Sequence, residues 1–345
     1  MVVAVRGSRL KPGKLPQDLL ERLVLRRVGV LDESVVVGPR VGEDAAVTKL
    51  GDDLYLVAHL DPITAAGRLA GWLAVHVACN DVAVTGARPR WLLSLILAPV
   101  EAAEEFIEEV TRQMHEAAVE LGVGIVGGHT EVVEDRQPLV AVTAVGVARR
   151  PVLTGGARPG DYIVMSKTAG VEGTAILATD FEGVLVERVG RDVVERAKSF
   201  LKRVSVVKEA IVLAEKGLVD AMHDPTEGGV LGGVYEMAYA SGLAAEVWLE
   251  EIPVAEETRL IAEAMGVDPY RLISSGVLLA AVPPDRVDEV LGVLRREAGV
   301  EAAVIGRFLG ERRPVVRVME GGVVKEVIDS MVPDEIYRVV SRASS

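Results

Sequence analysis

Short apolar runs and longer amphipathic segments alternate along the chain. In the first half the short runs are bounded by Gly and Asp, which predicts strands, and the longer segments follow the 3.6-residue period of helices. The predicted strands are residues 35–37, 45–48, 55–58, 91–97, 125–126 and 139–147, and the predicted helices are residues 19–27, 67–79 and 101–121. The helix at 101–121 is the clearest, because Phe106, Val110 and Met114 share one face and acidic residues crowd its first turn.

A stretch rich in Gly and Pro at residues 151–161 divides this pattern into two halves. The second half has predicted strands at residues 162–166, 244–249, 277–282, 303–308 and 315–318, and predicted helices at residues 191–216, 228–241, 256–265 and 285–298. We therefore predict a two-domain α/β (α+β) protein. Its parts are an N-terminal arm (1–18), a first domain (19–150) and a second domain (151–345).

The charge balance narrows the class of partner. The formal net charge is −13, which argues against a nucleic-acid partner because phosphate binding needs a basic face. No apolar run reaches the length of about 18 residues that a membrane span needs, and the first 14 residues lack the apolar core of a secretory signal. We expect no membrane contact and a cytoplasmic location.

Rare residue types add two expectations. Cys79 is the only cysteine, so an intramolecular disulfide and a zinc site with several thiolates are both excluded for these 345 residues. Asn80 is the only asparagine, and the chain has three glutamines. Few amides together with many Glu and Arg are typical of a thermophile, and Asn80 then becomes a candidate for a functional role.

Acidic residues stand at four places in the first 131 residues where the pattern predicts tight turns beside buried elements. They are Glu43-Asp44, Asp61, Asp81 and Glu131. Carboxylates held among Gly and Ala need a counter-charge, because burying a bare charge is costly, and hard oxygen ligands favour Mg²⁺. The alternative is that these residues only form Asx-turns and helix caps.

Other patterns point to competing readings. A G-x-G-x-x-G match at Gly122, Gly124 and Gly127 follows a predicted helix rather than a strand, which makes a dinucleotide fold unconvincing, and no Walker A loop is present. His59, His129 and His223 each lie within two residues of an acidic residue, so a His/Asp metal-dependent hydrolase stays open.

Three polar turns in the second half are candidate substrate contacts. The segment 167–174 follows a predicted strand and is rich in Gly and Thr, the segment 223–229 precedes a predicted helix, and the segment 274–276 is Ser-Ser-Gly. Asp224 or Thr226 is a candidate N-cap, and free amides after it are suited to an anion. Ordinary turns and a capping box explain these segments almost as well.

Taken together, these motifs resemble the aminoimidazole-ribonucleotide (AIR) synthetase-like superfamily. This superfamily includes thiamine-monophosphate kinase, selenophosphate synthetase and the HypE-type hydrogenase maturation factor. Among these subgroups, the motifs are most similar to the HypE-like one. The resemblance covers residues 40–310, and its most specific part is the string Asn-Asp-Val-Ala-Val-Thr-Gly-Ala-Arg-Pro at residues 80–89. It continues through Gly-Glu-Asp-Ala-Ala-Val at 42–47, Asp-Pro at 61–62, Gly-Gly-His-Thr-Glu at 127–131, Glu-Gly-Thr-Ala at 172–175, Asp-Pro-Thr-Glu-Gly-Gly at 224–229 and Ser-Gly at 275–276.

The resemblance implies an N-terminal domain with a mixed sheet that pairs across a homodimer and holds ATP, with a second α/β domain packed on it. It implies that Mg²⁺ is held by Asp44, Asp61 and Asp81. The positions expected to contact nucleotide or substrate are Glu43, Asp44, Asp61, Asn80, Asp81, Gly127, Gly128, Thr130, Glu172, Gly173, Thr174 and Thr226. The residues expected to carry catalysis are His129, His223 and Asp224.

Three departures limit what the resemblance implies. HypE-type proteins end in a tail whose Cys carries a carbamoyl group that ATP dehydrates, whereas this chain ends Arg-Ala-Ser-Ser at 342–345. His129 stands where related kinases have an acidic residue, and Glu227 stands where HypE-type sequences usually have Arg. We predict ATP-dependent phosphoryl activation of a carbonyl, amide or phosphate oxygen on an unidentified small-molecule or protein acceptor. The alternatives are a non-catalytic nucleotide-binding assembly factor and the metal-dependent hydrolase.

Overall fold

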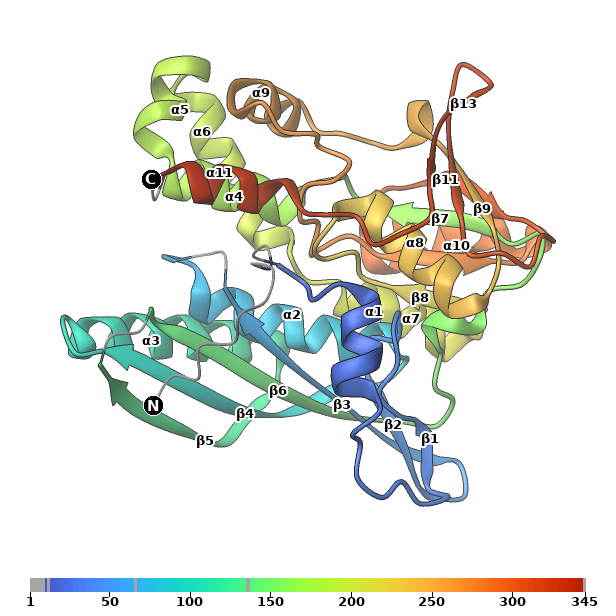
Figure 1. Cartoon of the computed structure of the whole chain (residues 1–345), viewed down its shortest axis with the longest axis horizontal. Coiled ribbons are helices and arrows are strands. Elements are labelled where there is room, and N and C mark those ends of the chain that lie inside the picture. Colours follow the sequence, from blue (N-terminus) through green and yellow to red (C-terminus); the bar gives the residue numbers. More distant parts are fainter. Residues whose placement is uncertain (1–9, 11–12, 65–66, 135–136, 344–345) are drawn as a thin grey trace.

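The computed structural model describes residues 10, 13–64, 67–134 and 137–343. Two β-sheets, each with its own helices, form the two halves of the molecule (Figure 1). The first sheet is built from residues up to Ala148 and the second begins at Tyr162. The predicted arm at residues 1–18 falls largely outside the described residues, and the described part of the chain enters a first helical turn at Gln17.

The first sheet has six strands in the order β1-β2-β3-β6-β4-β5. Its strands are β1 (Val35–Val37), β2 (Ala46–Gly51), β3 (Leu54–Ile63), β4 (Arg88–Pro99), β5 (Gly124–Val133) and β6 (Leu139–Ala148). All neighbours are antiparallel except β4 and β5, so the sheet is mixed. Short helical segments α1 (Gln17–Leu20) and Glu21–Leu25 precede it.

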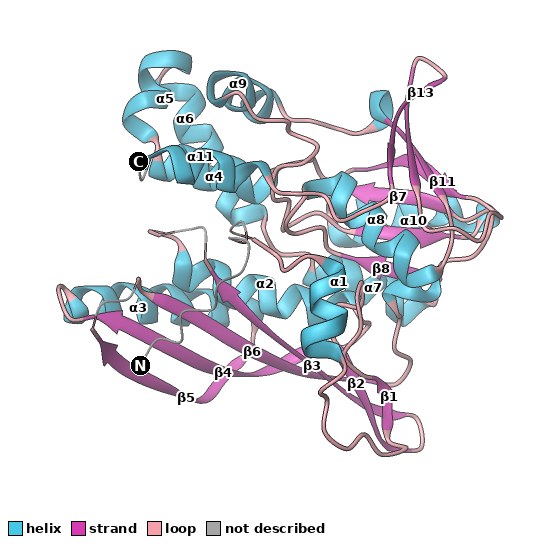
Figure 2. Ribbon diagram, viewed as in Figure 1, coloured by secondary structure: helices cyan, strands magenta, loops and turns pink. Residues whose placement is uncertain are grey.

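Helices α2 (Ala70–Val84) and α3 (Ala103–Leu121) cover one face of this sheet (Figure 2). Helix α2 is apolar on all sides, and all of its residues except Trp72 are buried. That pattern is expected for a helix inside a protein rather than on its surface. In Figure 1 it lies between the first sheet and the second half of the chain, which accounts for its burial.

The second sheet has seven strands in the order β13-β12-β9-β11-β7-β10-β8. Its strands are β7 (Tyr162–Ser166), β8 (Ala221–His223), β9 (Ala245–Trp248), β10 (Leu279–Val282), β11 (Ala302–Phe308), β12 (Val316–Glu320) and β13 (Val323–Ile328). Successive residues of β7 enter different hydrophobic cores: Ile163 packs with α8 (Gly229–Ser241), and Val164 packs with α7 (Val207–Lys216) and α10 (Val287–Val293). Because side chains alternate across a strand, helices on both faces complete this domain.

The remaining helices of the second half are α4 (Val171–Asp180), α5 (Glu182–Val189), α6 (Arg191–Lys198), α9 (Glu256–Met265) and α11 (Glu335–Ala343). The predicted two-domain mixed α/β class is confirmed. Among the described residues, no helix combines the length and the apolar character that crossing a membrane requires.

Several predicted element bounds were wrong. The single helix predicted at 191–216 is interrupted by a 3-10 segment at Ser199–Arg203 and by residues 204–206. The predicted turn at Asn80 and Asp81 is part of α2, and the predicted glycine turn at 127–130 lies within β5. The predicted glycine loop at 167–174 is a loop only as far as Gly170, and residues 171–174 form the first turn of helix α4.

Candidate functional site

Two groups of acidic and histidine side chains lie where the two domains meet. One group is Asp44, His223 and Asp224, and the other is His59, Asp61 and Asp81; within each group the ligand atoms lie within 4.8 Å of one another. The raised pKa of Asp81 has burial as its main cause, followed by the charges of Asp61 and Asp44, so the two groups form one electrostatic cluster. The carboxylates that the sequence predicted as metal ligands are therefore brought together.

Backbone structure explains how Asp61 and Asp81 meet. Asp61 lies on β3 two residues beyond His59 and four beyond Val57, so these three side chains point to the face covered by α2. Asp81 lies on α2, and its Oδ2 is 3.4 Å from Nε2 of His59. Neither carboxylate is in a turn, which rules out the Asx-turn reading for both.

Several polar atoms in this region are buried without a hydrogen-bond partner among the described residues. They are Oδ2 of Asp81, both carboxylate oxygens of Asp224, Oε2 of Glu172 and Oγ of Ser275. Burial of a carboxylate without partners disfavours its charged form. Accordingly, the pKa values of Asp81 and Asp224 are well above the usual range, and burial raises the pKa of Glu172 to about 8.

These orphaned oxygens fit a hard divalent cation. Mg²⁺ is held in proteins by one or two carboxylates together with water and phosphate oxygens, and it does not favour imidazole. Asp61 and Asp81 supply carboxylate oxygens in one group and Asp224 in the other, and a bound cation would offset both the burial and the mutual repulsion that raise the pKa values of Asp81 and Asp224. Both carboxylate oxygens of Asp44 are already hydrogen-bonded, one to His223 and the other to Thr154. We therefore take Asp224, rather than Asp44, as the third candidate ligand beside Asp61 and Asp81.

A chain of charged side chains, buried except for Lys14 at its outer end, supports Asp44. Nδ1 of His223 lies 2.6 Å from Oδ1 of Asp44, Nε2 of His223 lies 3.0 Å from Oε2 of Glu236, and Nζ of Lys14 donates to Oε1 of Glu236 at 2.8 Å. Burial lowers the pKa of His223, but the two flanking carboxylates outweigh it and raise that pKa well above the usual value. His223 is therefore a cation that fixes Asp44, and Thr154 donates to the other oxygen of Asp44 at 2.8 Å.

A cavity of about 540 Å³ opens beside the carboxylates. This volume lies within the range of roughly 300–1,000 Å³ that is usual for small-molecule sites. Its polar lining is Lys14, Asp61, Thr64, Glu172, Thr226, Glu227, Ser275 and Tyr337. Helix α11 closes one side, because the Tyr337 hydroxyl donates to Glu227 and lies 3.3 Å from Oγ1 of Thr64.

Three other residues that were predicted to contact nucleotide or substrate have structural roles in the described residues. The carboxylate of Glu43 accepts from the backbone N–H groups of Thr154 and Gly155. A Cβ on Gly173 would lie 2.4 Å from Cγ of Leu272, so this glycine allows close packing. The hydroxyl of Thr174 is buried against that of Thr258 at 2.8 Å. None of the three lines the cavity.

Asn80 also has a structural role. Its Nδ2 donates to the carbonyl of Val204 at 2.8 Å, and its Oδ1 accepts from the N–H of Val206 at 2.9 Å. The side chain is fully buried, and it satisfies the backbone where the predicted helix at 191–216 is broken. The lone asparagine thus joins the two domains instead of facing the cavity.

The β5 residues are placed away from this cavity. Asp61 pairs with Val142, Val142 with Ser94, and Ser94 with Gly128, so Gly128 lies in the same row as Asp61 but three strand spacings, about 14 Å, across the sheet. Gly127, His129 and Thr130 share this exposed edge strand, and Nε2 of His129 is 3.6 Å from Glu131. Because β5 lies away from the cavity of its own chain, a catalytic role for His129 stays a prediction.

Sequence patterns missed several residues of the site. Glu236 lies thirteen residues after His223 on α8, and Tyr337 belongs to a helix that was not predicted. Asp224 and Thr226 were considered as caps, but the N-cap of α8 is Gly228 and no side chain caps that helix. Lys14, whose ammonium group pairs with Glu236, precedes the first predicted helix and is marked by no motif.

The buried carboxylates predict how stability depends on pH. A carboxyl group whose pKa is raised on folding holds its proton in the folded state after the unfolded chain has lost it, so stability falls as pH rises. For Glu172, with a folded pKa of about 8, the loss occurs between about pH 5 and pH 8, and the raised pKa values of Asp81, Asp224 and Asp61 change stability in the same direction. We expect a decrease on the order of a few kcal/mol across this window, measured by denaturant unfolding of metal-free protein.

Magnesium provides the control for this pH effect. Because Mg²⁺ competes with protons for the same oxygens, it should raise stability more at the upper end of the window than at the lower end. Above the ordinary pKa of histidine, the raised pKa of His223 also makes stability fall as pH rises. Burial would raise the pKa of Glu236, but pairing with Lys14 and His223 outweighs burial and lowers that pKa to about 2. Glu236 therefore does not change stability within this window. Stability that rises with pH in metal-free protein would contradict the assignment.

Comparisons with known proteins agree with this arrangement. The family model described as "AIR synthase related protein, N-terminal domain" matches residues 42–148, and the corresponding C-terminal domain model matches residues 158–319. The chain is 28% identical to a putative hydrogenase expression/formation protein of Methanocaldococcus jannaschii, over 95% of this chain and 97% of that protein. It is 32% identical to the carbamoyl dehydratase HypE of Azotobacter vinelandii, over 75% of each chain.

A solved structure gives the same fold. The crystal structure of the hydrogenase maturation protein HypE in complex with ATP superposes with a TM-score of 0.69, at 26% identity, over 93% of this chain and 96% of that one. The matched family domains together span most of the chain, and a relative above 30% identity covers three quarters of it. The protein therefore belongs to the AIR synthase-related family, and within that family it is similar to the HypE hydrogenase maturation proteins.

Proposed function

We propose that this protein binds Mg-ATP at the carboxylate cluster and uses it to phosphorylate an oxygen atom of an acceptor. The observation that carries the proposal is the set of buried carboxylate oxygens of Asp81 and Asp224 without a hydrogen-bond partner among the described residues; Asp61, whose charge acts on both, lines the cavity. A structure of a HypE relative contains ATP, and the name of another relative describes dehydration of a carbamoyl group. Dehydration by ATP requires an oxygen to become a phosphate leaving group.

Each residue of the proposed site has a distinct role. Asp61, Asp81 and Asp224 hold the cation, which would supply charge neutralisation for the transferring phosphoryl group. Lys14 lies at the cavity, where its ammonium group faces the phosphates while Glu236 keeps it in place. Glu172, protonated at neutral pH because its pKa is about 8, offers a hydrogen-bond donor to an acceptor or a phosphate oxygen.

The acceptor is not a thiol of these 345 residues. Cys79 is their only cysteine, it is fully buried in α2, and burial raises the pKa of its thiol to about 12. A thiolate is the reactive form of cysteine, so Cys79 is inert at neutral pH. A second protein or a small molecule must therefore bring the oxygen.

Transfer of oxygen isotope tests the reaction. Mg-ATP would be incubated with the protein and with either an ¹⁸O-labelled carbamoyl compound or an ¹⁸O-labelled phosphate monoester. The proposal predicts ADP formation with one of the two acceptors: the carbamoyl compound would pass its ¹⁸O into inorganic phosphate on dehydration, or the monoester would carry its ¹⁸O into the bridge of a new phosphoanhydride, and either is read by the isotope shift in ³¹P NMR. Tight Mg-ATP binding without any ADP formation would instead support the non-catalytic assembly factor. Absence of Mg-ATP binding, with a tightly held transition metal, would support the hydrolase.

We also propose that two chains pair through the open face of the first sheet. Helices cover only one face of that sheet, and the exposed apolar side chains on the strands of the other face include Leu60, Trp91 and Leu93. An uncovered apolar face next to an exposed edge strand is typical of an interaction surface. Such pairing would bring a second copy of the β5 residues next to this sheet.

Substitution at the open face tests the pairing. We expect wild-type protein to elute as a dimer in size-exclusion chromatography with light scattering, and Leu93→Arg to elute as a monomer. Leu50→Arg, which also replaces an exposed leucine but on the β2 hairpin, is the matched control and should remain dimeric. A monomeric wild-type protein in the presence of Mg-ATP would reject the proposal.

A further inference from the structure

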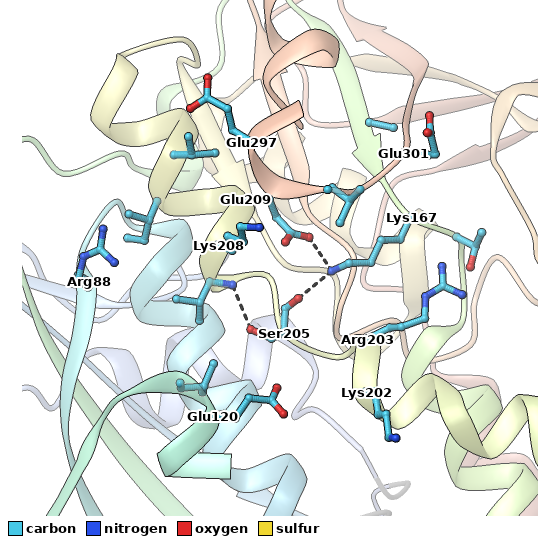
Figure 3. Close-up of a pocket in the computed structure, with 18 of the residues that line it drawn as sticks. Arg88, Glu120, Lys167, Lys202, Arg203, Ser205, Lys208, Glu209, Glu297 and Glu301 are labelled. Carbon is cyan, nitrogen blue, oxygen red and sulfur yellow. Dashed lines mark hydrogen bonds and ion pairs between the residues drawn. The ribbon is translucent and has the colours of Figure 1, made fainter. Parts of the chain in front are cut away.

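A second cavity, of about 1030 Å³, opens between the two domains on a different part of the molecule. Its walls come from the end of α3, the start of β4, the loop between β7 and α4, residues 202–212 and residues 297–302 (Figure 3). None of the residues that line the candidate ATP cavity lines this one. It is therefore a separate place where a ligand can enter the molecule.

Most of the acidic residues that line this cavity are already paired. Glu215 is 2.9 Å from Arg88, Glu209 is 2.6 Å from Lys167, Glu297 is 3.1 Å from Lys216 and Glu301 is 3.4 Å from Arg295. The fifth, Glu120, has among the described residues only His76 at 3.9 Å, and burial lowers the pKa of His76 to about 4, so that histidine is neutral. Glu120 thus contributes one negative charge.

Three cations remain after this pairing. Lys202, Arg203 and Lys208 line the cavity, and within the described part of the chain no carboxylate lies at ion-pair distance from any of them. In Figure 3 Lys202 and Arg203 lie on the same side as Lys167, and Lys208 lies on α7 next to Glu209. The residues that line the cavity include five cationic and five acidic side chains, so their formal charges balance, but Glu297 and Glu301 pair with Lys216 and Arg295 outside the lining, which leaves Lys202, Arg203 and Lys208 against Glu120.

Arg203 is the cation with most to gain from a ligand. Burial lowers the pKa of its guanidinium, which lies 4.8 Å from the centre of the Phe200 ring. The nearby carboxylate of Glu257 favours the charge on Arg203, but Glu257 is bonded to Arg196 at 2.7 Å. A partly desolvated guanidinium without its own carboxylate favours binding of an oxyanion, for which its planar donors are well matched.

An unused hydroxyl lines the same cavity. Oγ1 of Thr168 is buried and has no hydrogen-bond partner among the described residues. The preceding residue, Lys167, has φ of +56°, a backbone region that residues other than glycine seldom adopt, and its Nζ bonds to Glu209 and to the carbonyls of Ser205 and Gly276. Lys167 is therefore fully occupied in fixing this loop, and the Thr168 hydroxyl keeps an unused hydrogen-bonding capacity in the wall of the cavity.

We propose that this second cavity binds a small molecule that carries a phosphate group. Arg203, Lys202 and Lys208 neutralise the phosphate, and the Thr168 hydroxyl donates to one of its oxygens. A phosphate is favoured over a carboxylate because three cations and a hydroxyl exceed what a single carboxylate requires. The site does not depend on the ATP reaction proposed above.

Inorganic pyrophosphate in buffer with EDTA is the probe that tests this site, because removal of divalent cations disables the carboxylate cluster. Calorimetry should detect binding to wild-type protein, and the double variant Arg203→Glu/Lys208→Glu should bind at least about tenfold more weakly. Lys49→Glu, an exposed lysine on β2 that lies outside the cavity, should change the affinity less than about twofold. Asp81→Asn should leave the affinity unchanged.

Further measurements show whether the double variant is folded and which cavity pyrophosphate occupies. Circular dichroism and Mg-ATP binding of the double variant show whether it is folded, and the milder Thr168→Val and Lys202→Gln variants should each weaken pyrophosphate binding without loss of structure. Pyrophosphate that does not bind wild-type protein in the millimolar range overturns the proposal. So does a folded double variant with unchanged affinity, or a loss of binding in Asp81→Asn that places pyrophosphate in the other cavity.

Discussion

An Asp81→Asn protein should bind Mg-ATP roughly 10- to 100-fold more weakly than wild type and yet be the more stable protein without metal. Asp81 is buried on α2 with an unpartnered carboxylate oxygen, and burial together with the charges of Asp61 and Asp44 raises its pKa well above the usual range. Removing this charge relieves repulsion in the metal-free protein, and it also removes a ligand from the cation. A residue kept for stability alone would show the opposite sign in the unfolding experiment.

Calorimetry with Mg-ATP and denaturant unfolding in EDTA measure the two effects on the same preparation. We expect the free energy of unfolding of Asp81→Asn to exceed that of wild type by about 1 kcal/mol or more at pH 8. Asp52→Asn, whose side chain is fully exposed, is the matched control and should change neither quantity. Wild-type affinity for Mg-ATP in Asp81→Asn would refute the assignment of the metal site.

A His223→Leu protein should lose roughly 3 to 5 kcal/mol of stability, the largest effect expected for a single substitution here. His223 lies between Asp44 and Glu236, at 2.6 and 3.0 Å, and its replacement leaves two buried carboxylates facing an apolar side chain. Because His223 also fixes Asp44, Mg-ATP binding should weaken in any fraction that still folds.

His76→Leu is the matched control for this substitution. His76 is buried to the same degree, but it has no hydrogen-bond partner among the described residues, and burial lowers its pKa to about 4. A neutral imidazole without partners contributes little that leucine cannot replace, so His76→Leu should stay within about 1 kcal/mol of wild type. Equal destabilisation by the two substitutions would show that the charge chain has no special importance.

The local pattern of the chain predicted the carboxylates of the site but not the groups that hold them. Asp44, Asp61 and Asp81 stood out because each follows or interrupts an apolar segment, which is a property of neighbouring residues. The bonds from His223 to Asp44 and Glu236 join β8, the residues before β2, and α8, and no local pattern encodes such long-range pairing. The same reason explains why Tyr337 and Thr154 were missed.

Errors in the predicted elements also have physical causes. Gly170 and Gly173 suggested a loop, yet Gly170 adopts φ of +71° at the start of α4 and Gly173 allows that helix to approach Leu272. The glycines at 127 and 128 suggested a turn, but Gly128 is extended, with φ of +159°, where a Cβ would lie 2.3 Å from the carbonyl oxygen of Ser94. In both cases packing required glycine within a regular element.

The metal site can be located directly by anomalous scattering. Crystals would be grown with Mn²⁺ in place of Mg²⁺ and with a non-hydrolysable ATP analogue. We expect manganese peaks coordinated by oxygens of Asp61, Asp81 and Asp224, with the analogue's phosphates on the side of Lys14. Manganese absent from these carboxylates, or the nucleotide bound instead in the cavity of Lys202 and Arg203, would contradict this expectation.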